Sequence, residues 1–250
     1  MMPEPALVIF DCDGVLIDSE LIGCRAEAAE LARAGIAITA DEILARFTGI
    51  PASAMYATLE AKLGKALPAD LEARIAARIR ADFERELTPV RGIHAALERI
   101  VRPVCVASSS DPARLEHSLR LAGLFERFAP HIFGAAMVRH GKPAPDLFLY
   151  AAERMGAAPA DCVVIEDSQA GVRAGIAAGM RVFGFTGGSH CGPQHGERLR
   201  TAGAAALFAD MAALPGLIDC RAEDGSSPRR LIAALGDDHL AWGMSGGGDG

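Results

Sequence analysis

The chain is organised around the stretch Val8-Ile9-Phe10-Asp11-Cys12-Asp13-Gly14 near its amino terminus. Three apolar residues, typical of a buried strand, lead directly into two acidic residues one position apart, and a glycine follows that allows the backbone to turn. In an open α/β sheet, ligands bind beside the carboxyl ends of the strands. We therefore expect Asp11 and Asp13 to lie together in a pocket at one edge of a parallel sheet.

Helices and strands are unevenly distributed along the chain. Between the first strand and about residue 89, helix-forming segments occur without any convincing strand. From residue 90 onward, short apolar segments alternate with helical ones, which predicts an α/β fold with a Rossmann-like, doubly wound parallel sheet. Helices are expected at 19–35, 41–47, 52–64, 70–86, 91–100, 112–122, 145–155 and 170–178, and further strands at 103–107, 132–133, 162–165 and 181–185.

This distribution predicts two domains and a tail. Residues 1–17 and 90–218 would form the α/β core, and residues 18–89 would form an inserted α-helical bundle that acts as a cap over the sheet edge. Either Asp18 or Ser19 is the expected N-cap of the first cap helix. Residues 219–250 are rich in Gly, Ser, Asp and Arg, which is typical of a flexible tail.

Composition restricts the partners that we expect. The formal net charge is −7 and the 25 basic residues are scattered, which argues against a nucleic-acid partner. No apolar run approaches the ~20 residues needed to span a bilayer, and the amino terminus lacks a signal-peptide pattern. We therefore expect a cytoplasmic protein without membrane contacts, present as a monomer or weak homodimer.

The six cysteines show no CxxC motif or other regular metal-binding spacing, which is typical of a reducing compartment. His190, Cys191 and His195 lie in a glycine-containing segment after the strand expected at 181–185. Because the sequence does not supply a clear third ligand, we interpret this segment as a surface or substrate-edge loop rather than a transition-metal site.

Polar residues also follow three later strands. A hydroxyl-rich turn, Ser108 to Ser110, precedes a helix, and Lys142 lies between a glycine and a proline just before another. Glu166 and Asp167 form a second acidic pair directly after a buried strand. Four carboxylates at one sheet edge repel one another unless a cation is present, and hard oxygen ligands favour Mg²⁺.

These motifs are Asp11-x-Asp13-Gly14, Ser108, Lys142-Pro143 and Glu166-Asp167, in that order. In order and spacing they resemble the haloacid dehalogenase superfamily of phosphotransferases. The similarity is to the subclass with a helical cap after the first strand, which includes the β-phosphoglucomutase-like group and sugar-phosphate phosphatases. It covers roughly residues 6–215.

The resemblance implies a role for each core motif. Asp11 would be the nucleophile that forms an aspartyl-phosphate, and Asp13 the general acid and then the general base. Asp13 would need a carboxyl proton that exchanges near neutral pH. Ser108 would bind a phosphoryl oxygen with help from the Ser109 amide, and Lys142 would pair with the nucleophile and the transferring group. Mg²⁺ would be held by Asp11, the main-chain carbonyl of Asp13, Glu166 and Asp167.

Asp13 argues against dehalogenation, because a halide leaving group needs no proton. A receiver-type signalling domain would lack the Asp11–Asp13 pair. A non-enzymatic interaction protein is disfavoured because none of the four motifs has decayed. A mutase of the β-phosphoglucomutase type remains the alternative. Such mutases hold a second phosphate with a Lys and an Arg in a cap loop and a His after the first motif, whereas this chain has Thr48, Ala52 and Gly23 at those positions.

We therefore predict a Mg²⁺-dependent phosphatase that hydrolyses a small phosphomonoester, such as a sugar or polyol phosphate. The cap sequence is more similar to 6-phosphogluconate phosphatase-like members than to the mutases. The resemblance implies that the cap selects the leaving group, so the candidate substrate-binding residues there are Glu20, Arg46 and Thr48, with Arg25 as a further candidate.

Overall fold

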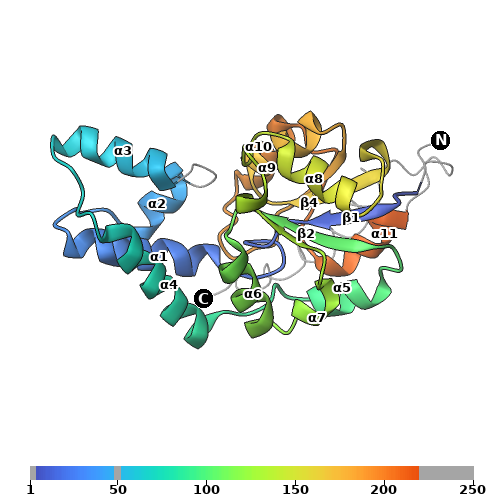
Figure 1. The fold of residues 1–250 in the computed structure, drawn as a ribbon, viewed down its shortest axis with the longest axis horizontal. Helices are drawn as coiled ribbons and strands as arrows, with labels where there is room; N and C mark the ends of the chain where they lie inside the picture. Colours follow the sequence, from blue (N-terminus) through green and yellow to red (C-terminus); the bar gives the residue numbers. More distant parts are fainter. Residues whose placement is uncertain (1–3, 48–51, 220–250) are drawn as a thin grey trace, which may run out of the picture.

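The computed structural model describes residues 4–47 and 52–219. Within these residues, a six-stranded sheet has the strand order β3-β2-β1-β4-β5-β6, and every neighbouring pair is parallel. The strands are β1 (Leu7–Phe10), β2 (Val104–Ser108), β3 (Ile132–Gly134), β4 (Cys162–Glu166), β5 (Arg181–Phe185) and β6 (Ala206–Phe208). The predicted α/β class with a doubly wound parallel sheet is confirmed (Figure 1).

Strand β1 lies in the middle of the sheet and is buried on both faces. Val8 pairs with Val104 of β2 on one side and with Val163 of β4 on the other. Successive strand residues point to opposite faces, so Val8 and Phe10 enter one hydrophobic cluster and Leu7 and Ile9 enter another. This explains why β1 reads as a continuous apolar run rather than an alternating one.

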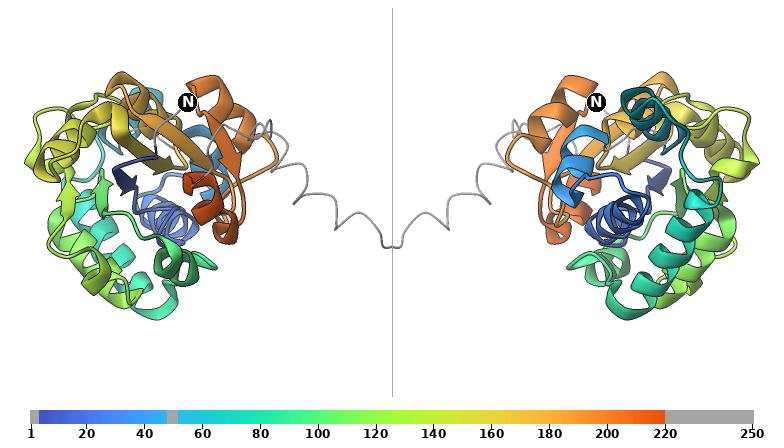
Figure 2. Two further views of the ribbon diagram at one scale, coloured as in Figure 1. Left: turned by 90° about the vertical axis from the view of Figure 1, so that its right-hand side faces the viewer. Right: turned by 90° about the vertical axis from the view of Figure 1, so that its left-hand side faces the viewer.

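Helices cover both faces of the sheet (Figure 2). The cluster that contains Phe10 packs against one group, and the cluster that contains Ile9 packs against the other. The first group comprises α5 (Ile93–Arg99), α6 (Pro112–Leu121), α7 (Phe125–Phe128) and α11 (Leu214–Asp219). The second comprises α8 (Asp146–Arg154), α9 (Gln169–Ala177) and α10 (His195–Ala202).

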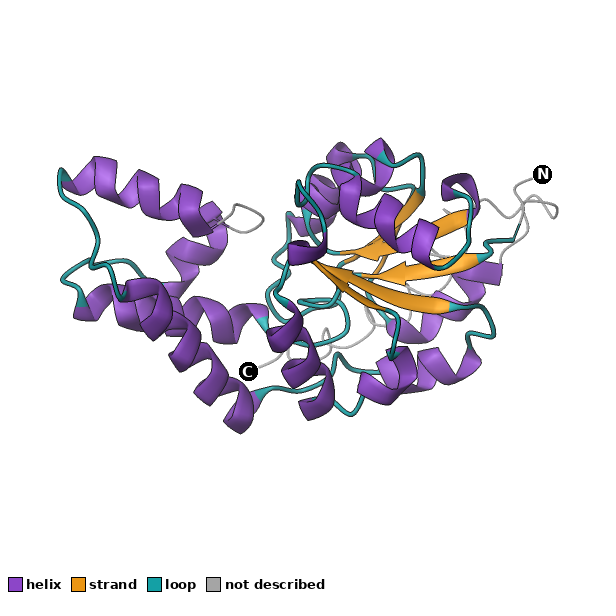
Figure 3. Cartoon of the chain, viewed as in Figure 1, coloured by secondary structure: helices purple, strands orange, loops and turns teal. Residues whose placement is uncertain are grey.

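Four helices between β1 and β2 lie together beside one end of the sheet (Figures 1 and 3). They are α1 (Glu20–Arg33), α2 (Ala40–Phe47), α3 (Ala52–Leu63) and α4 (Leu71–Glu86). They share a hydrophobic cluster of their own, which includes Leu31, Ile43 and Leu71. We refer to these helices as the cap. The exact domain boundaries remain a prediction, and residues 220–250, nearly all of the predicted tail, lie outside the described residues.

Two connecting segments join the cap to the sheet, and they run side by side. The Asp18 N–H donates to the Thr88 carbonyl at 3.0 Å, and the Val90 N–H donates to the Leu16 carbonyl at 3.0 Å. Ile17 also forms an antiparallel bridge with Pro89. The cap is therefore attached through one paired junction next to the first acidic motif.

Several short elements were not expected from the sequence, namely β6, α7, α10 and α11. Each is between three and eight residues long, so its hydrophobic pattern is too brief to identify a helix or strand without its neighbours. The segment at His195 was assigned to a loop, but His195 is the first residue of α10. Among the described helices, none has the length and apolar character needed to cross a membrane.

Candidate active site

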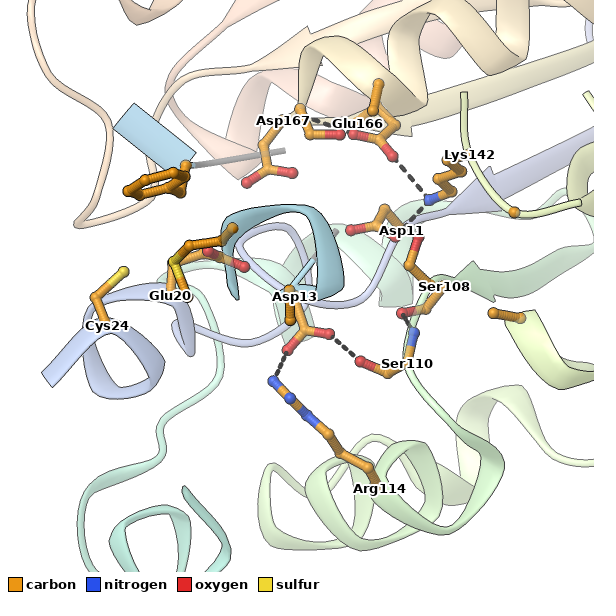
Figure 4. Close-up of a pocket in the computed structure, with 18 of the residues that line it drawn as sticks. Asp11, Asp13, Glu20, Cys24, Ser108, Ser110, Arg114, Lys142, Glu166 and Asp167 are labelled. Atoms are coloured by element: carbon orange, nitrogen blue, oxygen red, sulfur yellow. Dashed lines mark hydrogen bonds and ion pairs between the residues drawn. The ribbon is translucent and has the colours of Figure 1, made fainter. Parts of the chain in front are cut away.

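A cavity of about 540 Å³ lies where the carboxyl ends of β1, β2 and β4 face the cap (Figure 4). The sheet edge contributes polar side chains, whereas the cap contributes two carboxylates and several apolar residues. The sheet side of the lining includes Asp11, Asp13, Ser108, Ser109, Lys142, Glu166 and Asp167, and the cap side includes Glu20, Cys24, Glu27, Ile43, Phe47 and Met55.

Lys142 joins the two acidic motifs. Its ammonium group donates to Asp11 Oδ1 at 2.6 Å and to Glu166 Oε1 at 2.8 Å, and its side chain is only 4% exposed. Asp11 is itself held by the sheet, because its N–H donates to the Ile165 carbonyl and continues the β1–β4 ladder by one residue. Burial lowers the pKa of Lys142, but the charges of Asp11 and Glu166 outweigh it and raise that pKa above its ordinary value.

Asp11, Glu166 and Asp167 form a buried carboxylate cluster in which one oxygen of each lies within 4.8 Å of the others. Burial raises the pKa of Asp11 well above its ordinary value; Lys142 opposes this shift, and Glu166 and Asp167 add to it. A hard divalent cation would relieve this repulsion, so the donor set fits Mg²⁺.

Two glycines leave the space that these carboxylates occupy. A Cβ atom at Gly14, where φ is +78°, would lie 2.0 Å from Asp167 Oδ2. A Cβ atom at Gly171 would lie 1.6 Å from Glu166 Oε1. Any side chain at either position would displace a carboxylate, so the cluster depends on glycine at both.

Asp13 points away from that cluster. It accepts hydrogen bonds from Ser19 Oγ and Ser110 Oγ, each at 2.7 Å, and from the Arg114 guanidinium at 3.0 Å. Burial alone would raise the pKa of Asp13, but Arg114 and the two hydroxyl groups lower it below its ordinary value. The expectation of a near-neutral pKa is therefore wrong for this state, in which Asp13 is ionised at neutral pH. Its carboxylate is also directed away from the buried carboxylate cluster of Asp11, Glu166 and Asp167 (Figure 4).

Ser19 and Arg114 act differently from what sequence reasoning suggests. Ser19 occupies the N-cap position of α1, but its hydroxyl donates to Asp13 and caps nothing. Arg114 was not among the predicted residues. It lies in the first turn of α6, where a cation opposes the helix dipole. That unfavourable placement was the available sequence signal that Arg114 serves a partner outside its own helix.

Comparison with known proteins identifies the family. A sequence model of the haloacid dehalogenase-like hydrolases matches residues 5–179. The chain belongs to the haloacid dehalogenase-like hydrolase family. This hydrolase is 31% identical over 218 residues to the 6-phosphogluconate phosphatase of Escherichia coli (strain K12), covering 87% of this chain and 96% of the relative. It is 36% identical over 182 residues to hexitol phosphatase A of the same strain, covering 70% and 80%.

Solved structures of family members show the same fold. A conserved haloacid dehalogenase-like protein from Agrobacterium tumefaciens superimposes with a TM-score of 0.78 at 40% identity, covering 85% of this chain and 97% of that one. A candidate beta-phosphoglucomutase from Thermotoga maritima superimposes with a TM-score of 0.67 at 27% identity, covering 85% and 97%. The similarity of fold therefore extends to a protein named as a candidate beta-phosphoglucomutase.

The predicted core residues of this haloacid dehalogenase-like hydrolase lie around one cavity. Ser108 is buried, and its Oγ accepts from the Ser110 N–H at 3.1 Å. Ser109 is exposed and lines the cavity. Together with the carboxylates and Lys142, these residues line the same cavity.

The predicted cap residues are placed less uniformly. Glu20 lines the cavity, and burial, reinforced by the nearby charges of Asp167 and Asp13, raises its pKa to about 7. Arg46 is exposed with its guanidinium 5.0 Å from the Phe47 ring centroid; Phe47 lines the cavity and Arg46 does not.

The other candidate cation of the cap, Arg25, does not supply a positive charge to the described cavity lining. Arg25 is exposed and pairs with Glu86 at 2.6 Å, outside that lining. Thr48 lies outside the described residues, so its assigned role stays a prediction. Glu27, which sequence reasoning did not select, lines the cavity and accepts a hydrogen bond from the Tyr56 hydroxyl at 3.0 Å.

Residues 190–195 were interpreted as a surface or substrate-edge loop, and the surface interpretation is wrong for His190. This side chain is buried, and its Nε2 lies 2.9 Å from Asp167 Oδ2. Burial alone would lower the pKa of His190, but its hydrogen bond with Asp167 contributes to raising it to about 11. The carboxylate cluster is thus contacted by Lys142 on one side and by His190 on the other.

Proposed function

We propose that this hydrolase is a Mg²⁺-dependent phosphatase that hydrolyses a small sugar or polyol phosphate through an aspartyl-phosphate on Asp11. The observation that carries the proposal is the arrangement around Asp11. The buried Asp11 carboxylate is paired with Lys142 at 2.6 Å and belongs to the buried carboxylate cluster. It also lines the cavity between the sheet edge and the cap.

Asp11, Glu166, Asp167 and the main-chain carbonyl of Asp13 are the groups that would hold Mg²⁺. When bound, the ion would offset the negative charge of these carboxylates and of the substrate phosphate. Lys142 would add a second positive charge beside the nucleophile, in a position that it already occupies through its bonds to Asp11 and Glu166.

In the first step, an Asp11 carboxylate oxygen attacks the phosphorus atom and the ester P–O bond breaks. The leaving alkoxide takes a proton from Asp13. Because Arg114 and two serines keep Asp13 ionised in the free protein, it must acquire this proton when substrate binds. The hydroxyls of Ser19 and Ser110 and the Arg114 guanidinium fix the direction of the carboxyl group.

In the second step, a water oxygen attacks the phosphorus atom of the aspartyl-phosphate. Asp13 accepts the water proton, the bond between phosphorus and the Asp11 oxygen breaks, and inorganic phosphate leaves. An ionised Asp13 is the form that this step requires. The cap shields the reaction from bulk water, and its apolar residues Ile43, Phe47 and Met55 face the cavity.

The cap end of the cavity supports a neutral polyhydroxy leaving group. Glu20 and Glu27 can accept hydrogen bonds from hydroxyl groups, and among the described residues the cap contributes no Lys or Arg to the lining. A second phosphate there would meet carboxylates rather than a cationic clamp. This supports phosphatase over mutase activity, and relatives named 6-phosphogluconate phosphatase and hexitol phosphatase agree with it.

The test is release of inorganic phosphate from a panel of sugar and polyol phosphates, phosphoglycolate and nucleotides. We expect hydrolysis that requires Mg²⁺, stops with EDTA and is absent in Asp11→Asn. Asp41→Asn, at an exposed position of α2, is the matched control and should retain activity. Interconversion of β-glucose 1-phosphate and glucose 6-phosphate without hydrolysis would instead establish the mutase alternative.

A further inference from the structure

A second group of potential metal ligands lies next to the catalytic carboxylates. His190 and Cys191 follow β5, and His195 begins α10. One ring nitrogen of each histidine and the Cys191 sulfur all lie within 4.8 Å of one another. His190 is buried and the other two are partly exposed, so folding brings three donors of the nitrogen and sulfur type to one point.

Asp167 orients both histidine rings. His190 Nε2 lies 2.9 Å from the Asp167 carboxylate, and His195 Nε2 lies 2.7 Å from the Asp167 main-chain carbonyl. Each ring therefore has an oxygen partner at Nε2. Metal-binding histidines are typically held in this way, with the second ring nitrogen donating to a carboxylate or a backbone carbonyl.

The donor spacing is close to that of a tetrahedral zinc site. Zn–S and Zn–N bonds of about 2.3 and 2.0–2.1 Å place sulfur and nitrogen about 3.6 Å apart. The Cys191 sulfur lies 3.5 Å from Nε2 and 4.0 Å from Nδ1 of His190. In the structure the sulfur lies nearer Nε2 than Nδ1, so the thiol must move around the ring before sulfur and Nδ1 can bind one ion.

The backbone around His190 leaves room for the ring and for access. A Cβ atom at Gly188 would lie 2.8 Å from His190 Nδ1, and a Cβ atom at Gly14 would lie 2.9 Å from its Cε1. Glycine at both positions therefore leaves the space that the buried His190 ring occupies. A cavity of about 430 Å³, lined by His190 and His195, opens beside the group and provides a path of entry.

We propose that His190, Cys191 and His195 form a binding site for a transition-metal ion of the Zn²⁺ class. Thiolate and imidazole ligands select such ions, whereas the carboxylate cluster around Asp11 is suited to Mg²⁺. Three protein ligands leave the fourth position to water from the adjoining cavity. Because Asp167 belongs to the carboxylate cluster and also orients both histidines, the two sites are neighbours that share one residue.

The test uses Co²⁺, added to the metal-free full-length protein in the presence of excess Mg²⁺, which occupies oxygen-rich sites. We expect one equivalent of Co²⁺ to produce the visible bands of tetrahedral cobalt together with a near-ultraviolet thiolate-to-cobalt charge-transfer band. One equivalent of Zn²⁺ should abolish both signals. This readout does not depend on phosphatase activity, so it stands or falls separately from the proposed reaction.

Variants identify the ligands. Cys191→Ser should remove the charge-transfer band and weaken Co²⁺ binding at least about a hundredfold, because loss of a ligand costs more than the 10–100-fold typical of an orienting partner. His195→Gln should weaken binding similarly. Cys24→Ser, at a cysteine on α1 in the other cavity, is the matched control and should keep both signals.

Circular dichroism in the absence of metal checks that each variant is folded. If His195→Gln does not fold, the Cys191→Ser titration still decides the question, since it removes one sulfur atom from a partly exposed residue. The absence of a charge-transfer band in the unmodified protein, or an unchanged band in folded Cys191→Ser, would overturn the proposal.

Discussion

Replacing Lys142 by methionine isolates the cation that joins the two acidic motifs. Methionine keeps an unbranched apolar side chain but removes the ammonium group, whose Nζ lies 4.7 Å from the Phe148 ring centroid. The substitution removes two charge-assisted hydrogen bonds, of 2.6 and 2.8 Å, to Asp11 and Glu166. Both carboxylates would remain buried without this partner.

The expected loss of stability follows from that geometry. Removing one partner of a buried ion pair costs about 3–5 kcal/mol, because the remaining charge stays in a poorly solvated place. For a chain of this size, 1 kcal/mol shifts the melting temperature by about 2–4 °C, so Lys142→Met should melt roughly 6–20 °C lower at pH 7 without metal. Loss of a donor beside the reacting phosphate should also lower kcat by about 10²–10³.

The pH dependence has a definite sign. The pKa of Lys142 is raised above its ordinary value, so its contribution is complete below about pH 10 and is lost only as pH rises further. On the acid side, protonation of Asp11, whose pKa is raised by burial, removes an unpaired charge of the variant. The difference in melting temperature should therefore shrink as pH falls from 7 towards 4.

The assay is thermal unfolding of both proteins in EDTA from pH 4 to pH 9, with phosphate release measured in parallel. Lys62→Met, at an exposed position of α3, is the matched control and should change stability by less than about 0.5 kcal/mol. If Lys142→Met had the same melting temperature as the unmodified protein at pH 7, the assigned charge pairing would be refuted. A difference in melting temperature that is the same at every pH would also refute it.

Three further changes test other parts of the site. Gly171→Ala places a Cβ atom 1.6 Å from Glu166 Oε1, so the Mg²⁺ concentration for half-maximal activity should rise at least about tenfold. Arg114→Gln removes the charge that lowers the pKa of Asp13, so the limb of the pH–rate profile that reports Asp13 should move to higher pH. Burial raises the pKa of Glu20 from its ordinary value of 4.5 to about 7. Ionisation of Glu20 therefore destabilises the fold, and the melting temperature should decline, as pH rises from 4.5 to 7. Glu20→Gln should lack this decline.

Each of these changes has a matched control. Gly23→Ala adds a methyl group where no atom lies within 4 Å and should leave the Mg²⁺ requirement unchanged. Arg120→Gln, at an exposed position of α6, should leave the pH–rate profile in place. Glu72→Gln, at an exposed position in the first turn of α4, should keep the decline of stability towards pH 7. An effect of equal size in a control and its test variant would contradict the corresponding assignment.

Much of the fold could be predicted because its signals are local. The runs that became β1, β2, β4 and β5 are short, mostly apolar and each followed directly by a polar residue, which favours buried strands. The helices of the cap are long enough for their composition to be informative. Strand β6 was missed because three residues at a sheet edge carry too little pattern.

In the candidate site, too, some residues could be predicted from local sequence and others could not. Asp11 and Asp167 directly follow β1 and β4, and Glu166 is the last residue of β4, so their convergence could be expected from parallel topology. Arg114 could not, because its contact with Asp13 spans 101 positions and depends on how α6 is rotated against the sheet. The placement of Arg46 outside the cavity depends likewise on which face of α2 turns inward.

The sequence by itself determined which residues stand at the carboxyl ends of the strands, because strand ends and turns depend on neighbouring residues. Only the tertiary structure decided which partners those residues meet. It directed Asp13 to Arg114 and two serines, which lowers its pKa, and brought His190 and His195 to Asp167. The physical reason is that a pKa or a ligand set depends on distances of a few ångströms between side chains far apart in the chain. These distances arise only when the helices and strands pack.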